Sequence, residues 1–251
     1  MSLRVYRTGQ CRQLVSACDL VAVSAILLGL IAAPCRGAEQ KAAAAKSAAQ
    51  ASNDDLPLVI LLGDSIRINY QGTVRSELKG KAEVWSPKDN CAHSLYTLQN
   101  LERWLEGRNA TVVHINVGLH DMFLNAKTDQ PRHSLEVYST NLRKIFAKLK
   151  GLTDAKIIFA LTTPVDEKRQ ASSKTYKRVV RCNPDIVKYN QRAAEIAKEC
   201  GASVDDVHTV AMEAEIENVI CDDGVHLTKR GKEVVGKQVA RSVLSALGES
   251  H

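Results

Sequence analysis

The chain has 251 residues, a formal net charge of +6, 45% hydrophobic residues and 25% charged residues. At roughly 150 residues per domain, this length accommodates one large domain or two small ones, and it excludes a disulfide-stabilised mini-protein. The ordinary composition, with 14 Gly and 6 Pro, excludes a disordered or collagen-like chain.

The first 37 residues have the pattern of a secretory signal peptide. Three arginines precede the apolar stretch 20–33, and the small residues Cys35 and Gly37 precede a cleavage site after Gly37. The apolar stretch is short for a membrane span, although an uncleaved anchor is the alternative. Removal of this segment takes away four arginines and one aspartate, which leaves a weakly basic chain without the charge of a nucleic-acid binder. We therefore expect a secreted or periplasmic protein, with membrane attachment only if the segment is retained.

Residues 38–55 follow as a linker rich in Ala, Lys, Gln and Ser, with too little apolar surface to form a core. The folded domain is predicted to occupy residues 56–251.

Within this domain, short β-branched runs alternate with longer amphipathic segments. This alternation predicts an α/β fold with a parallel sheet covered by helices on both faces. The predicted strands are 58–62, 82–85, 111–117, 155–161 and 202–204, and the predicted helices are 73–78, 94–106, 134–149, 184–200 and 229–247. Ligands of such a sheet bind beyond the carboxyl ends of the strands, so the residues that follow each strand are the candidates for a functional site.

Gly63-Asp64-Ser65 follows the first predicted strand. A serine at a strand-to-helix turn projects both its hydroxyl and its N–H from the edge of the sheet, which is the position of a nucleophile. The same three residues also suit a plain turn and helix cap.

A serine hydroxyl needs a histidine base and a carboxylate that orients this base. Asp223 and His226 offer both groups three residues apart on a Gly-containing loop before the last helix. Asp205 and His208, after the fifth strand, are the alternative pair, although they also suit the start and flank of a helix. We favour His226 as the base and Asp223 as its partner.

Gly118-Leu119-His120-Asp121 follows the third predicted strand and brings His120 to the same edge as Ser65. The imidazole of His120 could donate a hydrogen bond to an oxyanion that forms during the reaction. The alternative is that His120 and Asp121 pair only to stabilise the loop.

Three blocks together, Gly63-Asp64-Ser65, Gly-x-x-Asp at 118–121 and Asp-x-x-His at 223–226, resemble the SGNH/GDSL hydrolase superfamily in order and spacing. The segments 63–67, 90–91, 118–121 and 162–165 are similar to a secreted bacterial subgroup of it. The resemblance implies a flavodoxin-like three-layer sandwich with a five-stranded sheet, and ester hydrolysis by Ser65, His226 and Asp223.

The resemblance also implies an oxyanion hole made of the nucleophile N–H, a glycine N–H and an asparagine side chain. Ser65 supplies the first donor. Cys91 is the nearest match to the glycine and His120 stands in place of the asparagine, so we expect Cys91 and His120 to provide the other two donors.

The side chains of the remaining histidines and cysteines are interpreted as structural, without a catalytic role. His114 lies within the third strand and is predicted to be a hydrogen-bonded core histidine. Cys91 lacks the surroundings of a thiol nucleophile, and the scattered Cys and His residues indicate neither a metal site nor a cofactor. The pairing of Cys91, Cys182, Cys200 and Cys221 cannot be chosen from their spacing. The basic stretch 168–181 is predicted to pass the rim of the site, either as a solvated segment or as a lid that favours anionic or polyhydroxylated substrates.

The predicted function is hydrolysis of small acyl esters, with acetyl groups on carbohydrates as the specific candidate, through an acyl-serine intermediate. Acyl transfer by the same residues is one alternative. A binding module that has kept the fold and lost catalysis is the other, although an inactive site has no reason to keep Ser65, Asp223 and His226 together.

Overall fold

The computed structural model of the protein describes residues 56–125, 127–176 and 179–249. The predicted signal peptide 1–37 and linker 38–55 lie outside the described residues. Within the described ranges, no helix combines the length and apolar character needed to cross a membrane.

The central feature is a parallel sheet of five strands in the order β2-β1-β3-β6-β8. This is the flavodoxin-like order, in which the chain reverses direction across the sheet between β1 and β3. The predicted fold class is therefore confirmed. The strands are β1 (Leu58–Gly63), β2 (Glu83–Trp85), β3 (Ala110–Asn116), β6 (Lys156–Ala160) and β8 (Ser203–Asp205).

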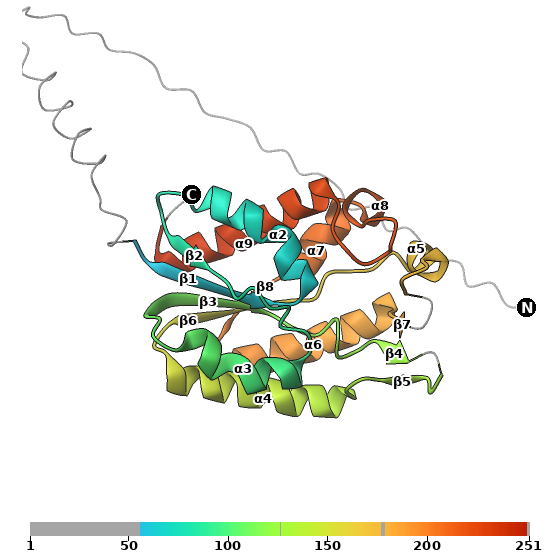
Figure 1. Ribbon diagram of the computed structural model, residues 1–251, viewed down its shortest axis with the longest axis horizontal. Coiled ribbons are helices and arrows are strands. Elements are labelled where there is room, and N and C mark those ends of the chain that lie inside the picture. The colour runs from blue at the N-terminus through green and yellow to red at the C-terminus, as the bar shows by residue number, and fades with distance from the viewer. Residues whose placement is uncertain (1–55, 126, 177–178, 250–251) are drawn as a thin grey trace, which may run out of the picture. The chain divides into compact units, whose positions relative to one another are not determined.

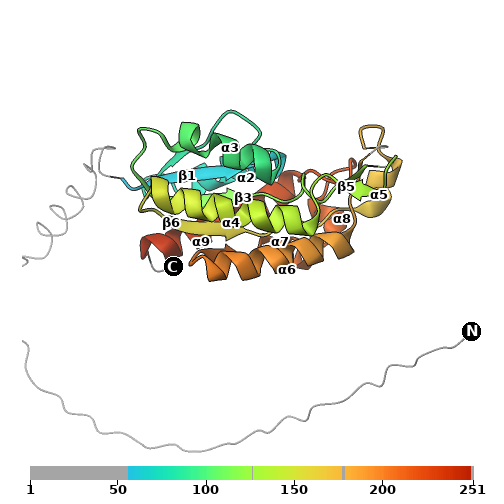
Figure 2. The same cartoon turned by 90° about the horizontal axis from the view of Figure 1, so that it is seen from below.

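Helices cover both faces of the sheet (Figure 1). One face carries α2 and α9, which pack against each other, together with α7 and α8. The other face carries α3, α4 and α6, and α4 and α6 lie side by side when seen from below (Figure 2). The helices are α2 (Ser65–Glu77), α3 (Ser94–Leu105), α4 (Leu135–Leu152), α5 (Glu167–Ser172), α6 (Asn183–Glu199), α7 (Val207–Glu213), α8 (Ile216–Val219) and α9 (Lys229–Leu247).

The core lies between the sheet and these two helical layers. In β1, the residues from Val59 to Leu62 are fully buried, because a central parallel strand has helices on both of its faces. Ile66, Tyr70 and Val74 recur every four residues along α2 and are buried, so one face of this helix packs onto the sheet.

The helix α2 begins at Ser65, eight residues before the predicted start at Thr73. The sequence did not predict the first two turns because polar residues and Gly72 interrupt the periodic pattern of apolar residues there. The Asp64 side chain caps the helix by accepting a hydrogen bond from Ile66 N at 2.9 Å. The predicted nucleophile is therefore the first residue of a helix that rises directly from β1.

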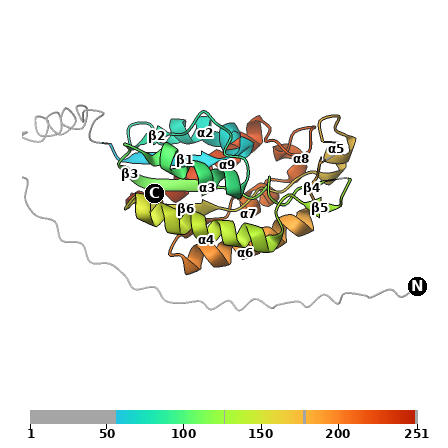
Figure 3. The same ribbon diagram turned by 60° about the horizontal axis from the view of Figure 1, so that its bottom comes forward.

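A second, antiparallel sheet of three short strands was not predicted. It has the order β5-β4-β7 and consists of β4 (Leu124–Asn125), β5 (Gln130–Pro131) and β7 (Val179–Val180). The sheet lies with α5 at the end of the molecule toward which the carboxyl ends of the main strands point (Figure 3). It joins the loop after β3 to the end of the basic stretch 168–181.

Candidate active site

The turn from β1 into α2 fixes the direction of Ser65. A side chain at Gly63 would place its Cβ 2.7 Å from Arg67 Cβ and 3.2 Å from Asn116 Cβ, so the turn has room only for glycine. The N–H of Ser65, at the first position of α2, has no acceptor within the helix. Both the hydroxyl and this N–H are therefore presented at the carboxyl edge of the sheet.

Ser65, His226 and Asp223 form a continuous hydrogen-bonded chain. His226 Nε2 lies 2.9 Å from Ser65 Oγ, and His226 Nδ1 lies 2.7 Å from Asp223 Oδ2. Asp223 Oδ1 accepts the N–H groups of Val225 and His226 at 2.9 Å each. These contacts fix the carboxylate on one side of the imidazole and leave the opposite ring nitrogen facing the serine.

The loop that carries His226 is closed at both ends. Cys221 N donates to His226 O at 2.7 Å, and Ile220 pairs with Leu227 in an antiparallel bridge. Leu227 N also donates to Asn69 Oδ1 at 2.9 Å. Because Asn69 belongs to α2, the helix that carries the serine also anchors the loop that carries the histidine.

Gly224 joins this loop to the segment after β6. Its φ of +79° is favourable for glycine, and an added Cβ would lie 2.3 Å from Gln170 N. Asp166 N donates to Gly224 O at 2.9 Å. The loop of Asp223 and His226 and the helix α5 therefore meet through backbone atoms.

Two carboxylates beside the serine have pKa values shifted in opposite directions. Burial acts to raise the pKa of Asp223, but the hydrogen bonds from His226 and Val225 outweigh it and hold the pKa below its usual value. Full burial raises the pKa of Asp64 to about 6, against the opposing effects of the Ile66 N–H and the nearby charges of Arg181, His226 and Arg67. Asp223 is therefore an ionised partner for His226 at neutral pH.

His120 follows β3 on the same edge of the sheet, as predicted. Burial, together with the positive charges of Arg181 and Arg132, lowers the pKa of His120 to about 4. Its imidazole is thus neutral at pH 7 and has one N–H to donate. The alternative pairing with Asp121 is not formed in the structure, because Asp121 accepts hydrogen bonds from Ser94 and from His133 Nδ1 instead.

Cys91 is fully buried next to the site. Its N–H, the second predicted oxyanion donor, donates to Gly63 O at 3.1 Å and reaches a substrate oxygen only if that bond breaks. Burial raises the pKa of the Cys91 thiol to about 11, which agrees with its interpretation as an unreactive thiol. All four cysteines in the described ranges are free.

The alternative pair Asp205 and His208 is separated by the fold. Asp205 is buried and lies 3.0 Å from His114 Nε2 through its Oδ2, which confirms His114 as a hydrogen-bonded core histidine. The helix cap predicted for Asp205 is wrong, because the side chain of Asp206 caps α7. His208 lies on α7, whereas the hydroxyl of Ser65 is paired with His226.

Two residues of the basic stretch 168–181, Tyr176 and Arg181, lie near the site although the sequence did not predict them as site residues. Tyr176 OH is 3.5 Å from His226 Nδ1, and Arg181 Nε donates to Leu119 O, directly before His120, at 3.1 Å. No sequence motif marks either residue, since the small sheet that brings them to the site depends on pairing between distant segments.

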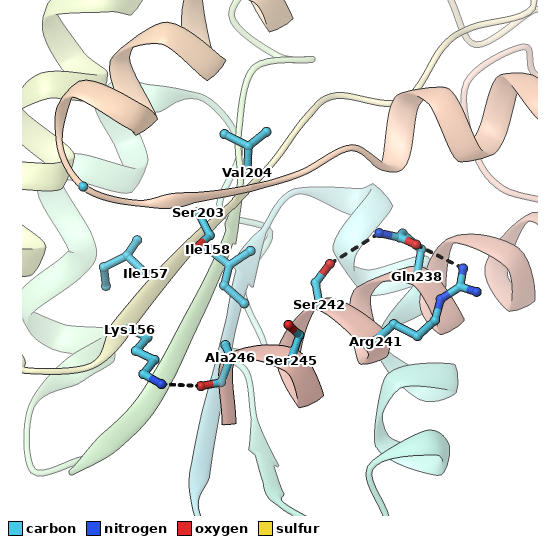
Figure 4. Close-up of a pocket in the computed structure, with 11 residues that line it drawn as sticks. Lys156, Ile157, Ile158, Ser203, Val204, Gln238, Arg241, Ser242, Ser245 and Ala246 are labelled. Atoms are coloured by element: carbon cyan, nitrogen blue, oxygen red, sulfur yellow. Dashed lines mark hydrogen bonds between the residues drawn. The ribbon is translucent and has the colours of Figure 1, made fainter. Parts of the chain in front are cut away.

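A pocket of about 610 Å³ lies at the opposite end of the main sheet (Figure 4). It is bounded by the first residues of β6, the start of β8 and the second half of α9. None of the residues that line it belongs to the predicted site.

Comparison with known proteins identifies the family of the chain. The sequence matches the GDSL-like Lipase/Acylhydrolase family over residues 61–234. It is 32% identical over 120 residues to the GDSL esterase/lipase CPRD49 of Arabidopsis thaliana, an alignment that covers 46% of this chain and 47% of the relative. The chain thus spans about half the length of this curated relative.

Two solved structures share the fold. The structure of the acetyl xylan esterase AlAXEase is similar with a TM-score of 0.59 and 19% identity, covering 74% of this chain and 99% of that one. The lipase/acylhydrolase from Enterococcus faecalis has a TM-score of 0.61 and 18% identity, covering 76% and 96%. With the match over most of the folded domain, the chain belongs to the GDSL-like lipase/acylhydrolase family.

Proposed function

We propose that the protein is a carboxylic ester hydrolase that works through an acyl-serine intermediate. The observation that carries the proposal is the hydrogen-bonded chain from Ser65 Oγ through His226 to Asp223, with distances of 2.9 Å and 2.7 Å. A serine, a base and an orienting carboxylate in this order are what activation of a hydroxyl requires. An inactive binding module would not need this chain of contacts.

In the first half-reaction, Ser65 Oγ attacks the carbonyl carbon of the ester while its proton passes to His226 Nε2. Asp223 holds the ring in the tautomer that accepts this proton and stabilises the imidazolium. The tetrahedral intermediate then collapses. The bond from carbon to the alcohol oxygen breaks, His226 returns the proton to that oxygen, and the acyl group stays on Ser65.

The negative charge on the carbonyl oxygen of this intermediate needs donors that are already in place. We assign the Ser65 N–H, at the start of α2, and the neutral imidazole of His120 to this role. A neutral His120 donates one hydrogen bond without adding a charge that would disturb the protonation of His226.

In the second half-reaction, a water molecule gives a proton to His226 and attacks the acyl carbon. The bond from the acyl carbon to Ser65 Oγ breaks and the proton moves to Oγ. The products are the carboxylic acid and the restored serine.

We further propose small acyl groups, with acetyl groups on carbohydrates as the specific substrate, and a secreted or periplasmic site of action. The similar fold of an acetyl xylan esterase supports the first proposal. The side chains of Asp223 and His226, 30% and 28% exposed, leave the site accessible to a large alcohol. The second proposal rests on the signal-peptide pattern of residues 1–37.

The test is a hydrolysis screen with p-nitrophenyl acetate, butyrate and octanoate and with acetylated xylose, comparing the wild type with Ser65→Ala. We expect turnover that is fastest for the acetyl ester and that Ser65→Ala abolishes. Activity that survives in Ser65→Ala would rule out the acyl-serine mechanism. Addition of an acceptor sugar separates hydrolysis from acyl transfer, because transfer yields an acylated sugar in place of free acid.

A further inference from the structure

Arg181 is a buried arginine that forms no salt bridge within the described ranges and leaves part of its hydrogen-bonding capacity unused. The residue directly follows β7 and is only 4% exposed. Its Nε donates to Leu119 O at 3.1 Å, but Nη1 is buried and has no hydrogen-bond partner among the described residues. No carboxylate of the described chain lies within salt-bridge distance of its guanidinium, and the charges of Asp64 and Asp223 act on it from farther away. Buried charges in proteins are normally paired, so this arrangement calls for an explanation.

The buried Arg67 shows how this same protein treats an arginine with a purely structural role. Arg67 is 1% exposed, and all three of its guanidinium nitrogens donate hydrogen bonds. Its acceptors are the Gln71 side chain and the backbone oxygens of Gly63, Pro87 and Asp89. Compared with Arg67, Arg181 keeps unused capacity to donate.

Arg181 lies next to the proposed catalytic groups. Its Cζ is 5.3 Å from the centre of the Tyr176 ring, and Tyr176 OH is 3.5 Å from His226 Nδ1. Its hydrogen bond to Leu119 O places it beside the backbone that leads into His120. The positive charge of Arg181 contributes to lowering the pKa of His120.

A pocket and a second arginine, Arg132, lie beside Arg181. A pocket of about 410 Å³ is bounded in part by Tyr176, Arg181 and Gln170, and the buried Gln170 Oε1 also lacks a partner. The carboxylate of Glu167, which lines the same pocket, accepts hydrogen bonds from Asn183. Two arginines contact the ring of Phe123. The Cζ of Arg181 lies 5.7 Å from the ring centre, and the Cζ of the exposed Arg132 lies 4.5 Å from it. Within the described ranges, neither guanidinium forms a salt bridge, so two cations share one aromatic ring beside the site.

We propose that Arg181 is a specificity residue that binds a carboxylate on the ester substrate, with Arg132 as a second cation at the rim. An incoming carboxylate supplies the directly bonded counter-charge that Arg181 lacks, and a guanidinium binds a carboxylate with two parallel hydrogen bonds. The substrate class is therefore carboxylate-bearing esters. This inference rests on the proposed esterase function and makes it more specific.

The experiment compares charged and neutral esters of the same shape on one protein sample. For a carboxylate in the alcohol part, the pair is 4-acetoxybenzoate and 4-acetoxybenzamide. For a carboxylate in the acyl part, the pair is the mono-4-nitrophenyl ester of adipate and 4-nitrophenyl hexanoate. Each kcat/KM is divided by the rate constant for hydroxide-catalysed hydrolysis of the same ester. Both esters of a pair are measured on the same protein sample. A smaller fraction of folded protein therefore lowers both kcat/KM values equally and cancels in their ratio.

We expect the wild type to prefer the charged ester in one of the two pairs, which identifies the part of the substrate that carries the carboxylate. Arg181→Met should lower this preference by about 10- to 100-fold, the loss typical of a charge-assisted hydrogen bond. Arg181→Lys should retain part of it. Arg241→Met, which changes an arginine at the far end of the sheet (Figure 4), should leave the preference unchanged.

Two outcomes overturn the inference. The first is a wild type that prefers neither charged ester, and the second is an Arg181→Met variant that loses activity equally on both members of a pair, as expected if Arg181 only balances the buried Asp64. If Arg181→Met does not fold, inhibition of the wild type by 4-hydroxybenzoate and 4-hydroxybenzamide decides the question for the alcohol part. The carboxylate should inhibit at least tenfold better. The esterase proposal is tested separately, by turnover of the neutral esters and its loss in Ser65→Ala.

Discussion

Ser65 Oγ and His226 Nε2 lie 2.9 Å apart although 161 residues separate them in the sequence. The contact depends on α2, which carries Ser65 at its first position and holds Leu227 N through Asn69. One helix thus sets the position of both reacting groups.

The first prediction separates the two histidines that were candidates for the base. His226→Ala should lower kcat/KM for p-nitrophenyl acetate by roughly 10⁴-fold or more, because the serine loses its proton acceptor. His208→Ala, on α7, should leave turnover close to that of the wild type. A fluorophosphonate probe should label Ser65 in the wild type, as located by mass spectrometry. Labelling of another serine, or equal activity losses in the two variants, would contradict the assignment.

The second prediction concerns the oxyanion role of His120. His120→Ala should lower kcat by about 10²- to 10³-fold with a smaller change in KM, because the donor acts mainly in the transition state. His120→Asn restores a side-chain amide and should retain more activity than His120→Ala. Steady-state kinetics on variants of equal melting temperature make the comparison. If both variants match the wild type, His120 does not bind the oxyanion.

The third prediction tests the close approach at Gly224. Gly224→Ala should lower both the melting temperature and kcat, because φ is +79° and the new Cβ would lie 2.3 Å from Gln170 N. Gly72→Ala is the matched control, since Gly72 lies in α2 with no atom within 4 Å of an added Cβ. This control should raise the free energy of unfolding by about 0.5–1 kcal/mol. Equal stability of the two variants in thermal unfolding would show that the Gly224 contact has no energetic weight.

The fourth prediction uses the raised pKa of Asp64. Its pKa of about 6 in the folded protein lies above the ordinary value of 3.8, so the folded state binds more protons than the unfolded state between these values. The free energy of unfolding contributed by this group therefore falls as pH rises from about 4 to 6, by up to about 3 kcal/mol. Asp64→Asn should remove this dependence in urea unfolding at several pH values.

The matched control for this prediction is Asp206→Asn, which changes an exposed carboxylate at the cap of α7. It should leave the slope between pH 4 and 6 as in the wild type. Parallel stability curves for the wild type and Asp64→Asn would show that Asp64 does not carry the effect.

The main strands could be predicted from the sequence because a strand buried on both faces is a continuous run of apolar residues, which ends where polar residues or glycine begin. The run Leu58 to Leu62 has no polar residue, and all of it except the partly buried Leu58 is fully buried within the sheet, as expected. Gly63-Asp64-Ser65 and the pair Asp223 and His226 follow from local chemistry once the sheet is recognised. Their contact could be predicted because parallel strands bring their carboxyl ends to one edge.

The remaining features depend on contacts that no local pattern encodes. The Cys91 N–H looks free in the sequence, yet the fold pairs it with Gly63 O. Arg181 reaches the site only because Val180 pairs with Leu124 in the small sheet, and strands of two residues leave no periodicity to read. Both features depend on contacts between segments that are distant in the sequence. The sequence alone therefore could not predict the hydrogen bond of Cys91 or the position of Arg181.

The packing of α2 against α9 also constrains how the protein gains activity as it folds. The serine stands at the start of the folded domain and the histidine just before its last helix, so an N-terminal fragment that ends before Asp223 lacks two of the three residues of the hydrogen-bonded chain. Contacts between such distant segments form late, because closing long loops costs entropy before any native contact compensates for it. Ester hydrolysis during refolding would therefore report the docking of the final helix and not the formation of the sheet.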